Sequence, residues 1–136
     1  KEENSMATLG DYLQTADWKT EKHVPVIELK EPVKKGEPVA VHVSVGAEIP
    51  HPHTTEHHIR YIKLFYKPEG EKFIVHLGSY LFEAHGESVA GANQGSAKCE
   101  PAVTATITLE KPGQLLAVSY CNIHGLWENS KEITFA

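Results

Sequence analysis

Two segments of the sequence alternate between apolar and small or polar residues, and this pattern constrains the fold more than any other feature. In residues 38–45 the apolar positions are Val39, Val41, Val43 and Val45. In residues 102–109 they are Val103, Ala105, Ile107 and Leu109. A period of two is that of a β-strand with one buried face, because successive side chains of a strand point to opposite sides. Each segment therefore predicts a strand that covers a hydrophobic core.

Five further segments have the composition of strands. They are residues 23–29, 57–66, 73–82, 114–120 and 132–135, the last a short closing strand. Gly78 predicts a bulge or a bend within its strand. Turn sequences rich in glycine, proline and lysine separate several of these segments. About seven strands with turns at intervals of about 8–12 residues predict an all-β fold, an antiparallel β-sandwich.

The length of 136 residues predicts one domain, residues 1–136, without repeats or linkers. Residues 1–20 predict an N-terminal extension with a short helix at 8–14, which Thr8 caps with Asp11 three residues later. Trp18 is expected to anchor this extension to the core.

The net charge of −5 argues against a nucleic-acid partner, because phosphate binding requires a basic face. No apolar run approaches the roughly 18 residues that a membrane span requires. The sequence has no segment with the pattern of a secretory signal, which predicts a cytoplasmic protein. Two cysteines are too few for a disulfide scaffold.

The chain contains nine histidines, and histidine is the commonest metal ligand. Residue types that bind metals gather at four places where strands begin or end. These places are Glu21-Lys22-His23, His51-Pro52-His53, Glu56-His57-His58 and Cys121-Asn122-Ile123-His124. Because loops held by a rigid scaffold commonly carry functional sites, this pattern favours a metal centre.

Several of these residues also have simpler interpretations. His42 and His76 are expected to be solvated, and His85 to be a hydrogen-bonded structural residue. His57 and His58 are adjacent in a strand, so at most one of them readily reaches a common centre. The pattern leaves open whether His51 or His53 points inward, and Cys121 can also be read as an inert buried thiol.

One thiolate with four or five imidazoles favours a redox metal, either copper in a His₂Cys site or iron with several histidines. Structural zinc sites usually have two or more thiolates. The sequence contains neither the Gly-x-Ser-x-Gly elbow of many hydrolases nor a glycine-rich phosphate loop.

Five motifs of the chain resemble those of superoxide reductases, specifically the one-iron class that is also called neelaredoxin. The motifs are residues 21–27, Ile49-Pro50-His51-Pro52, residues 54–59, residues 84–89 and residues 119–127, which occur in the same order. The resemblance extends from about Thr15 to the C-terminus. It implies an immunoglobulin-like β-sandwich that holds one mononuclear non-haem iron.

The resemblance also implies a role for each site residue. His23, His51, His57 and His124 would supply four equatorial nitrogens, and Cys121 would supply the axial thiolate. Glu21 would occupy the sixth position in the oxidised state, and Lys22 would guide and stabilise the substrate. The reaction would be the one-electron reduction of superoxide to hydrogen peroxide, with rubredoxin as electron donor and a homotetrameric assembly.

Two departures from the family and two competing functions remain. His53 adds a fifth imidazole near the site, expected to be a solvated loop residue, and Cys99 is expected to be structural or incidental. The chain lacks the additional N-terminal Cys₄ domain of the two-iron class, so electrons would pass directly to the one centre.

The competing functions are a cupredoxin-like copper electron-transfer protein, which shares a Cys-x-x-His near its C-terminus, and a binding sandwich with incidental histidines.

Overall fold

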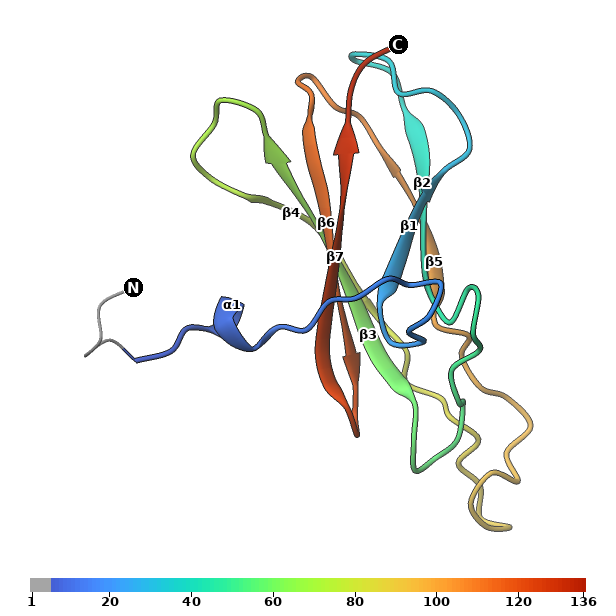
Figure 1. Cartoon of the computed structure of the whole chain (residues 1–136). Helices are drawn as coiled ribbons and strands as arrows, with labels where there is room; N and C mark the ends of the chain where they lie inside the picture. The colour runs from blue at the N-terminus through green and yellow to red at the C-terminus, as the bar shows by residue number, and fades with distance from the viewer. Residues whose placement is uncertain (1–5) are drawn as a thin grey trace.

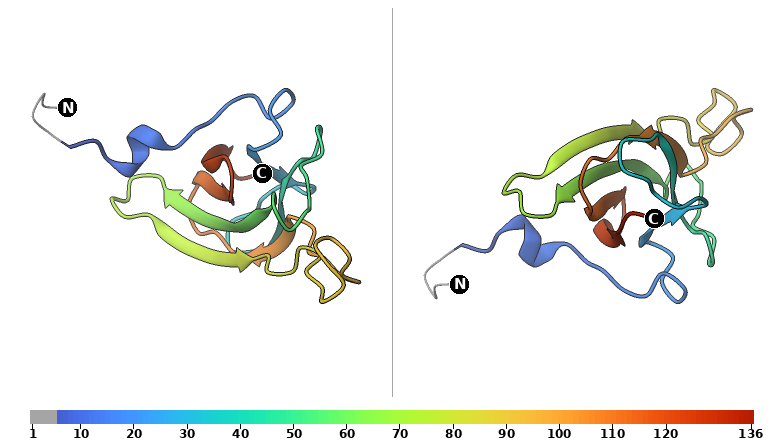
Figure 2. Two further views of the ribbon diagram at one scale, coloured as in Figure 1. Left: turned by 90° about the horizontal axis from the view of Figure 1, so that it is seen from below. Right: turned by 90° about the horizontal axis from the view of Figure 1, so that it is seen from above.

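The computed structural model describes residues 6–136 and has seven strands in two antiparallel sheets (Figure 1). The strands are β1 (Pro25–Leu29), β2 (Val39–Val45), β3 (Ile59–Pro68), β4 (Val75–Leu81), β5 (Ala102–Ile107), β6 (Gly113–Cys121) and β7 (Gly125–Ile133). One sheet has the order β1-β2-β5 and the other the order β4-β3-β6-β7. The two sheets face each other across the core, so the fold is the all-β sandwich that the sequence predicts (Figure 2).

The core lies between the two sheets and consists of the alternating apolar faces. Val41 and Val43 of β2 are fully buried, as are Ile62 of β3 and Leu115 of β6. Burial of each such side chain contributes about 1.5–3 kcal/mol relative to an exposed one. The two clean alternations in the sequence are therefore confirmed as strands that cover the core.

The predicted closing strand at 132–135 is wrong in extent, because β7 runs from Gly125 to Ile133. It pairs with β6 along its whole length, from Cys121 opposite Gly125 to Gly113 opposite Ile133. As an edge strand it carries polar side chains at positions that a central strand would fill with apolar ones, so its strand pattern is weak. Gly125 has φ of +82°, which allows a three-residue hairpin loop between the two strands.

The predicted irregularity in β4 is present. Opposite β3, Leu64 pairs with Gly78 but Phe65 pairs with His76, so Leu77 is an additional residue in the ladder. This is the two-against-one arrangement of a β-bulge, next to the glycine that indicated it.

The N-terminal segment extends away from the two sheets and carries α1 (Leu9–Tyr12), which is shorter than the predicted helix at 8–14 (Figure 2). Thr8 precedes the helix, and its backbone N–H donates to the Asp11 carboxylate at 2.7 Å. Residues 1–5 of the predicted extension, which spans residues 1–20, lie outside the described residues. Among residues 6–136, no helix has the length and apolar character needed to cross a membrane.

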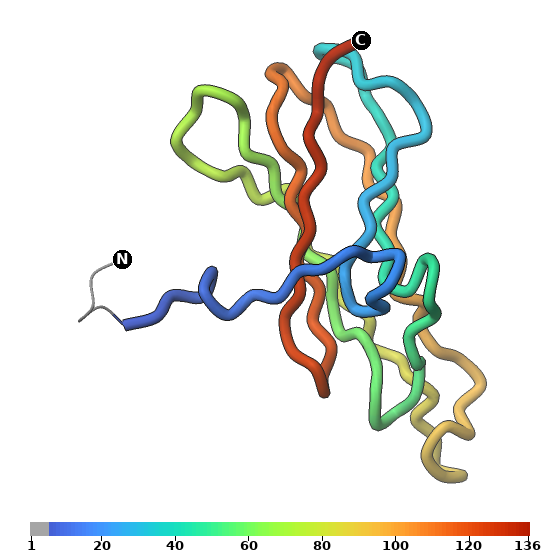
Figure 3. Tube along the Cα trace, in the orientation of Figure 1, coloured from blue at the N-terminus to red at the C-terminus, as the bar shows by residue number. Residues whose placement is uncertain are grey.

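Strand pairing brings the histidine-rich segments to one end of the sandwich, where the connections gather (Figure 3). Pro25 at the start of β1 pairs with Val45 at the end of β2. Ile59 at the start of β3 pairs with Cys121 at the end of β6. The segments just outside these four strand ends therefore meet.

Candidate metal centre

Five side chains from these segments converge. The ligand atoms of His23, His51, His57 and Cys121 all lie within 4.8 Å of one another. His124 joins them, because its Nδ1 lies 3.1 Å from His23 Nε2 and 3.2 Å from His57 Nε2. The structure thus brings together the five residues to which the resemblance assigns imidazole and thiolate ligands.

The four imidazoles form a square. Neighbouring ring centroids are 5.0 Å apart for His23 and His51, 4.7 Å for His51 and His57, 5.0 Å for His57 and His124, and 4.5 Å for His124 and His23. The centroids of His23 and His57 are 6.4 Å apart, so these two rings stand across the diagonal.

The Cys121 sulfur lies to one side of this square. It is 3.8 Å from His124 Nδ1 and within 4.8 Å of the ligand atoms at the other three corners. If the sulfur lay in the plane of the square and outside one corner, it would be much farther than 4.8 Å from the ligand atom at the opposite corner. The backbone N–H of His124 also approaches the sulfur at 3.4 Å, so the hairpin itself orients the thiol.

The hydrogen bonds of two rings leave their inward nitrogens free for a metal. His51 Nδ1 lies 2.9 Å from the carbonyl oxygen of Pro52, which can only accept, so Nδ1 carries the proton. His51 Nε2 is then a lone pair that is buried without a partner among the described residues. The Glu21 carboxylate contacts Nδ1 of His23, which leaves Nε2 of that ring facing His124. A bound cation would satisfy these inward nitrogens.

The spacing of the donors also fits a metal ion. Adjacent ligands at about 2.1 Å from one ion, with right angles between them, are about 3 Å apart. The two closest pairs of ring nitrogens, at 3.1 and 3.2 Å, match this separation. The group therefore fits a square of nitrogens with sulfur on one side.

Burial favours the neutral form of His23, His51 and His57, which is the form that binds metals. The pKa of His51 is lowered to about 4, chiefly by burial and to a smaller extent by the nearby groups His23, His57 and Lys22. Burial is also the largest cause of the lowered pKa of His23 and of His57. Their lone pairs are thus available without competition from protons.

Acidification should destabilise the metal-free protein because of His51. The folded pKa of His51 lies below the ordinary histidine value of 6.5, so the unfolded chain binds the proton first as the pH falls. The contribution of His51 is fully present above about pH 6.5 and should fall by about 2 kcal/mol by pH 5. Denaturant unfolding at pH 7 and pH 5 measures this loss, and His51→Asn should reduce the pH dependence. An equal pH dependence in that variant would contradict the assignment to His51.

Glu21 does not face the centre of the square in this structure. Its carboxylate accepts a hydrogen bond from the His23 backbone N–H at 2.9 Å and contacts Nδ1 of the same ring. These contacts, with the charges of His23 and Lys22, lower the pKa of Glu21 against the opposing effect of burial, which is the largest single influence. The carboxylate therefore orients the His23 ring from its outer nitrogen.

Lys22 places positive charge beside the cluster. Its charge contributes to the lowered pKa of three imidazoles, those of His23, His51 and His57. The residue is half-buried on the segment that leads into β1. Lys22 thus supplies positive charge near the centre although the chain carries −5 overall, beside the negative carboxylate of Glu21.

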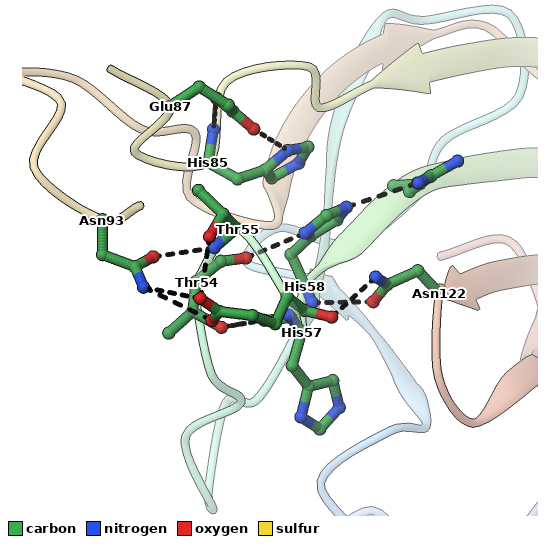
Figure 4. Close-up of polar contacts among 10 residues, drawn as sticks. Thr54, Thr55, His57, His58, His85, Glu87, Asn93 and Asn122 are labelled. Atoms are coloured by element: carbon green, nitrogen blue, oxygen red, sulfur yellow. Dashed lines mark hydrogen bonds and ion pairs between the residues drawn. The ribbon is translucent and has the colours of Figure 1, made fainter. Parts of the chain in front are cut away.

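His58 lies outside the cluster, as expected for one of the two adjacent histidines, although both precede β3 and are not part of a strand as predicted. Its Nδ1 donates to the carbonyl of Thr54 at 2.9 Å (Figure 4). Arg60 Nε approaches its Nε2 at 3.3 Å. Its ring stacks on that of His85, with centroids 3.4 Å apart. Both ring nitrogens of His58 are thus engaged by other groups.

The remaining histidines have separate partners. His85 is buried and contacts Glu87, in agreement with a structural role. His53 is a partly exposed loop residue, with Nε2 3.5 Å from Glu100, and it does not belong to the cluster. His42 contacts Thr104, and His76 contacts Ser79.

Sequence reasoning missed two residues that shape the site. Gly46 has φ of +88°, and a Cβ atom there would lie 2.8 Å from the backbone nitrogen of His51. Glycine is therefore required for the backbone at His51 to lie this close to residue 46. Asn122 bonds to the backbone on both sides of His57. A glycine after a strand was a visible signal, whereas no sequence pattern distinguished Asn122.

Comparison with known proteins gives one consistent family. Neelaredoxin of Megalodesulfovibrio gigas is 53% identical over 123 residues, which are 90% of this chain and 95% of that protein. Superoxide reductase of Pyrococcus furiosus is 54% identical over 121 residues, or 89% of this chain and 95% of that protein. The solved structure of superoxide reductase (neelaredoxin) from Archaeoglobus fulgidus in the reduced form has a TM-score of 0.85 and 51% identity, with coverage of 90% and 98%.

The sequence pattern of the Desulfoferrodoxin family matches residues 15–130, which include all five residues of the cluster. This range also agrees with the part of the sequence in which the resemblance to superoxide reductases was found. The chain therefore belongs to the desulfoferrodoxin family.

Proposed function

We propose that the protein is a superoxide reductase, which reduces superoxide by one electron to hydrogen peroxide at a mononuclear non-haem iron. The observation that carries this proposal is the square of four imidazoles with one cysteine sulfur beside it. Relatives that are more than 50% identical over most of the chain carry the names superoxide reductase and neelaredoxin. The iron would be held by His23, His51, His57, His124 and Cys121.

The donor set supports iron over the other metals. A blue-copper site uses two imidazoles and one thiolate, whereas four imidazoles converge here. This difference argues against the cupredoxin-like alternative. A binding sandwich with incidental histidines does not explain a buried, unpartnered imidazole nitrogen that belongs to such a square.

Bound ferrous iron would supply one electron and an open coordination position for the substrate. The reaction consumes superoxide, one electron and two protons, which water can provide, and it yields hydrogen peroxide. Cys121 would contribute a thiolate that the His124 N–H orients. Each of His23 and His51 would be held by a bond to its outer ring nitrogen, which fixes ligand orientation in metal sites.

Lys22 and Glu21 would act on the side of the centre from which the substrate enters. Lys22 would attract the superoxide anion, because its charge already acts on three of the imidazoles. Glu21 would occupy the sixth position in the oxidised state, and this requires its carboxylate to leave the His23 ring. The two residues are neighbours on one segment, so a single movement of that segment would exchange them.

The resemblance to the one-iron class supports two further parts of the proposal. The electron donor would be a rubredoxin-type protein, and the chain would assemble as a homotetramer. A cytoplasmic location is consistent with a rubredoxin-type donor and with a homotetramer.

The proposed function is tested on protein purified from its native source without added metal. We expect one iron per chain by elemental analysis, and rapid superoxide consumption without oxygen release when a reductant is supplied. One copper per chain with no superoxide consumption would favour the cupredoxin-like function. A colourless, metal-free protein would favour the binding sandwich.

A further inference from the structure

The side chain of Asn122 connects two of the segments that form the centre. Its Oδ1 accepts a hydrogen bond from the backbone N–H of His58 at 2.9 Å, and its Nδ2 donates to the carbonyl of Glu56 at 2.9 Å. Its own backbone N–H donates to the carbonyl of His58 at 3.2 Å. Figure 4 shows Asn122 directed toward the backbone beside His57. One residue of the β6–β7 hairpin thus holds the backbone on both sides of His57.

The other side of the His57 loop is held by groups that do not belong to the hairpin. Thr54 accepts from the His57 N–H through its hydroxyl, at 3.0 Å, and closes the turn within the loop. Asn93 accepts from the Thr55 N–H at 2.8 Å and donates to the Glu56 carboxylate at 3.0 Å. These bonds shape the loop and attach it to residues 83–101, but they do not set its distance from Cys121.

That distance matters because His57 and His124 are less buried than the other two imidazoles of the square. His23 and His51 are buried within the protein, whereas His57 is half-buried and His124 is exposed. The two outer rings meet at 3.2 Å between His57 Nε2 and His124 Nδ1. Little packing therefore holds these two rings, and the backbone link through Asn122 replaces it.

We propose that Asn122 is a positioning residue that fixes His57 relative to Cys121 and His124, so that the three can bind one metal ion. This inference rests on the proposed function, in which these three residues hold iron. Asparagine in a hairpin loop commonly bonds to its own turn. Here the amide instead leaves the hairpin and bonds to residues 56 and 58, which are more than 60 positions away in sequence.

The test compares iron-loaded wild type with Asn122→Ala, Asn122→Asp and Tyr66→Phe. The control removes a bond of the same kind, from Tyr66 Oη to the Lys111 carbonyl at 2.7 Å, near the Gly113 end of β6 and away from the cluster. For each protein, the rate of iron release to a chelator, the thiolate-to-iron absorption band and the unfolding transition are measured.

Asn122→Ala should release iron about 10–100-fold faster than wild type and shift or weaken the absorption band, since loss of a group that orients a ligand has effects of this size. Asn122→Asp keeps the acceptor for His58 N–H but places a carboxylate oxygen against the Glu56 carbonyl. It should therefore show a smaller change in the same direction. Tyr66→Phe should lower the unfolding temperature without changing the release rate or the band.

Two results would overturn the proposal. One is that both Asn122 variants have the same iron-release rate and the same absorption band as wild type. Another is faster release in Tyr66→Phe equal to that in the Asn122 variants, because the effect would then come from general destabilisation. If Asn122→Ala does not fold, the comparison of Asn122→Asp with Tyr66→Phe tests the proposal by the same criteria. If wild type itself binds no iron with a thiolate band, the proposed function fails first and this inference with it.

Discussion

Replacing Cys121 by serine should abolish the thiolate-to-iron absorption band and reduce superoxide reduction by more than about 100-fold. Groups that only orient a ligand typically change metal affinity or activity by 10–100-fold, and loss of the ligand itself should exceed that range. Cys121 is fully buried at the end of β6. Serine oxygen is a harder ligand than thiolate, so the centre would lose the electron density that sulfur donates.

Cys99→Ser provides the matched control, because it removes the second thiol of the chain. Cys99 is free, half-buried and located in the long loop before β5. The control should keep the absorption band, the iron content and the activity. A band that survives in Cys121→Ser and disappears in Cys99→Ser would refute the assignment of Cys121 as the axial ligand.

Removal of the positive charge of Lys22 should have the next largest effect. Superoxide is an anion, and the chain carries −5 overall, so attraction must come from charge near the centre. We expect Lys22→Ala to lower the second-order rate constant for superoxide by about tenfold or more at low salt. Its rate should also depend less on ionic strength, because screening acts on the charge that has been removed.

Lys19→Ala separates this local effect from the change in net charge. Lys19 is exposed, and its ammonium lies 5.8 Å from the centre of the Trp18 ring. Both variants change the net charge equally, but only Lys22 contributes to the lowered pKa of the cluster imidazoles. Stopped-flow or pulse-radiolysis rates at several salt concentrations measure the difference. Equal rates and equal salt dependence in wild type and Lys22→Ala would exclude the steering role.

The strands that cover the core were predictable because their alternation reflects one buried and one outer face. Val41 and Val43 are fully buried, as the period of two requires. The first half of β7 was not predictable by the same reasoning. It is an edge strand that forms because the backbone of β6 offers pairing partners along its whole length. Its own side chains do not alternate strictly between buried and exposed.

The sequence by itself determined which residue types stand at the strand ends, and these include the four histidines and the cysteine of the cluster. Only the tertiary structure decided the order of the rings around the square, since His23 and His124 are neighbours there although 101 positions separate them. It also decided that His57 and not His58 faces the centre, that Glu21 contacts the His23 ring, and that Asn122 holds both sides of His57. The physical reason is that hydrogen bonds and metal ligation require separations of a few ångströms. Between residues far apart in sequence, such separations are set by strand register and by the packing of the two sheets.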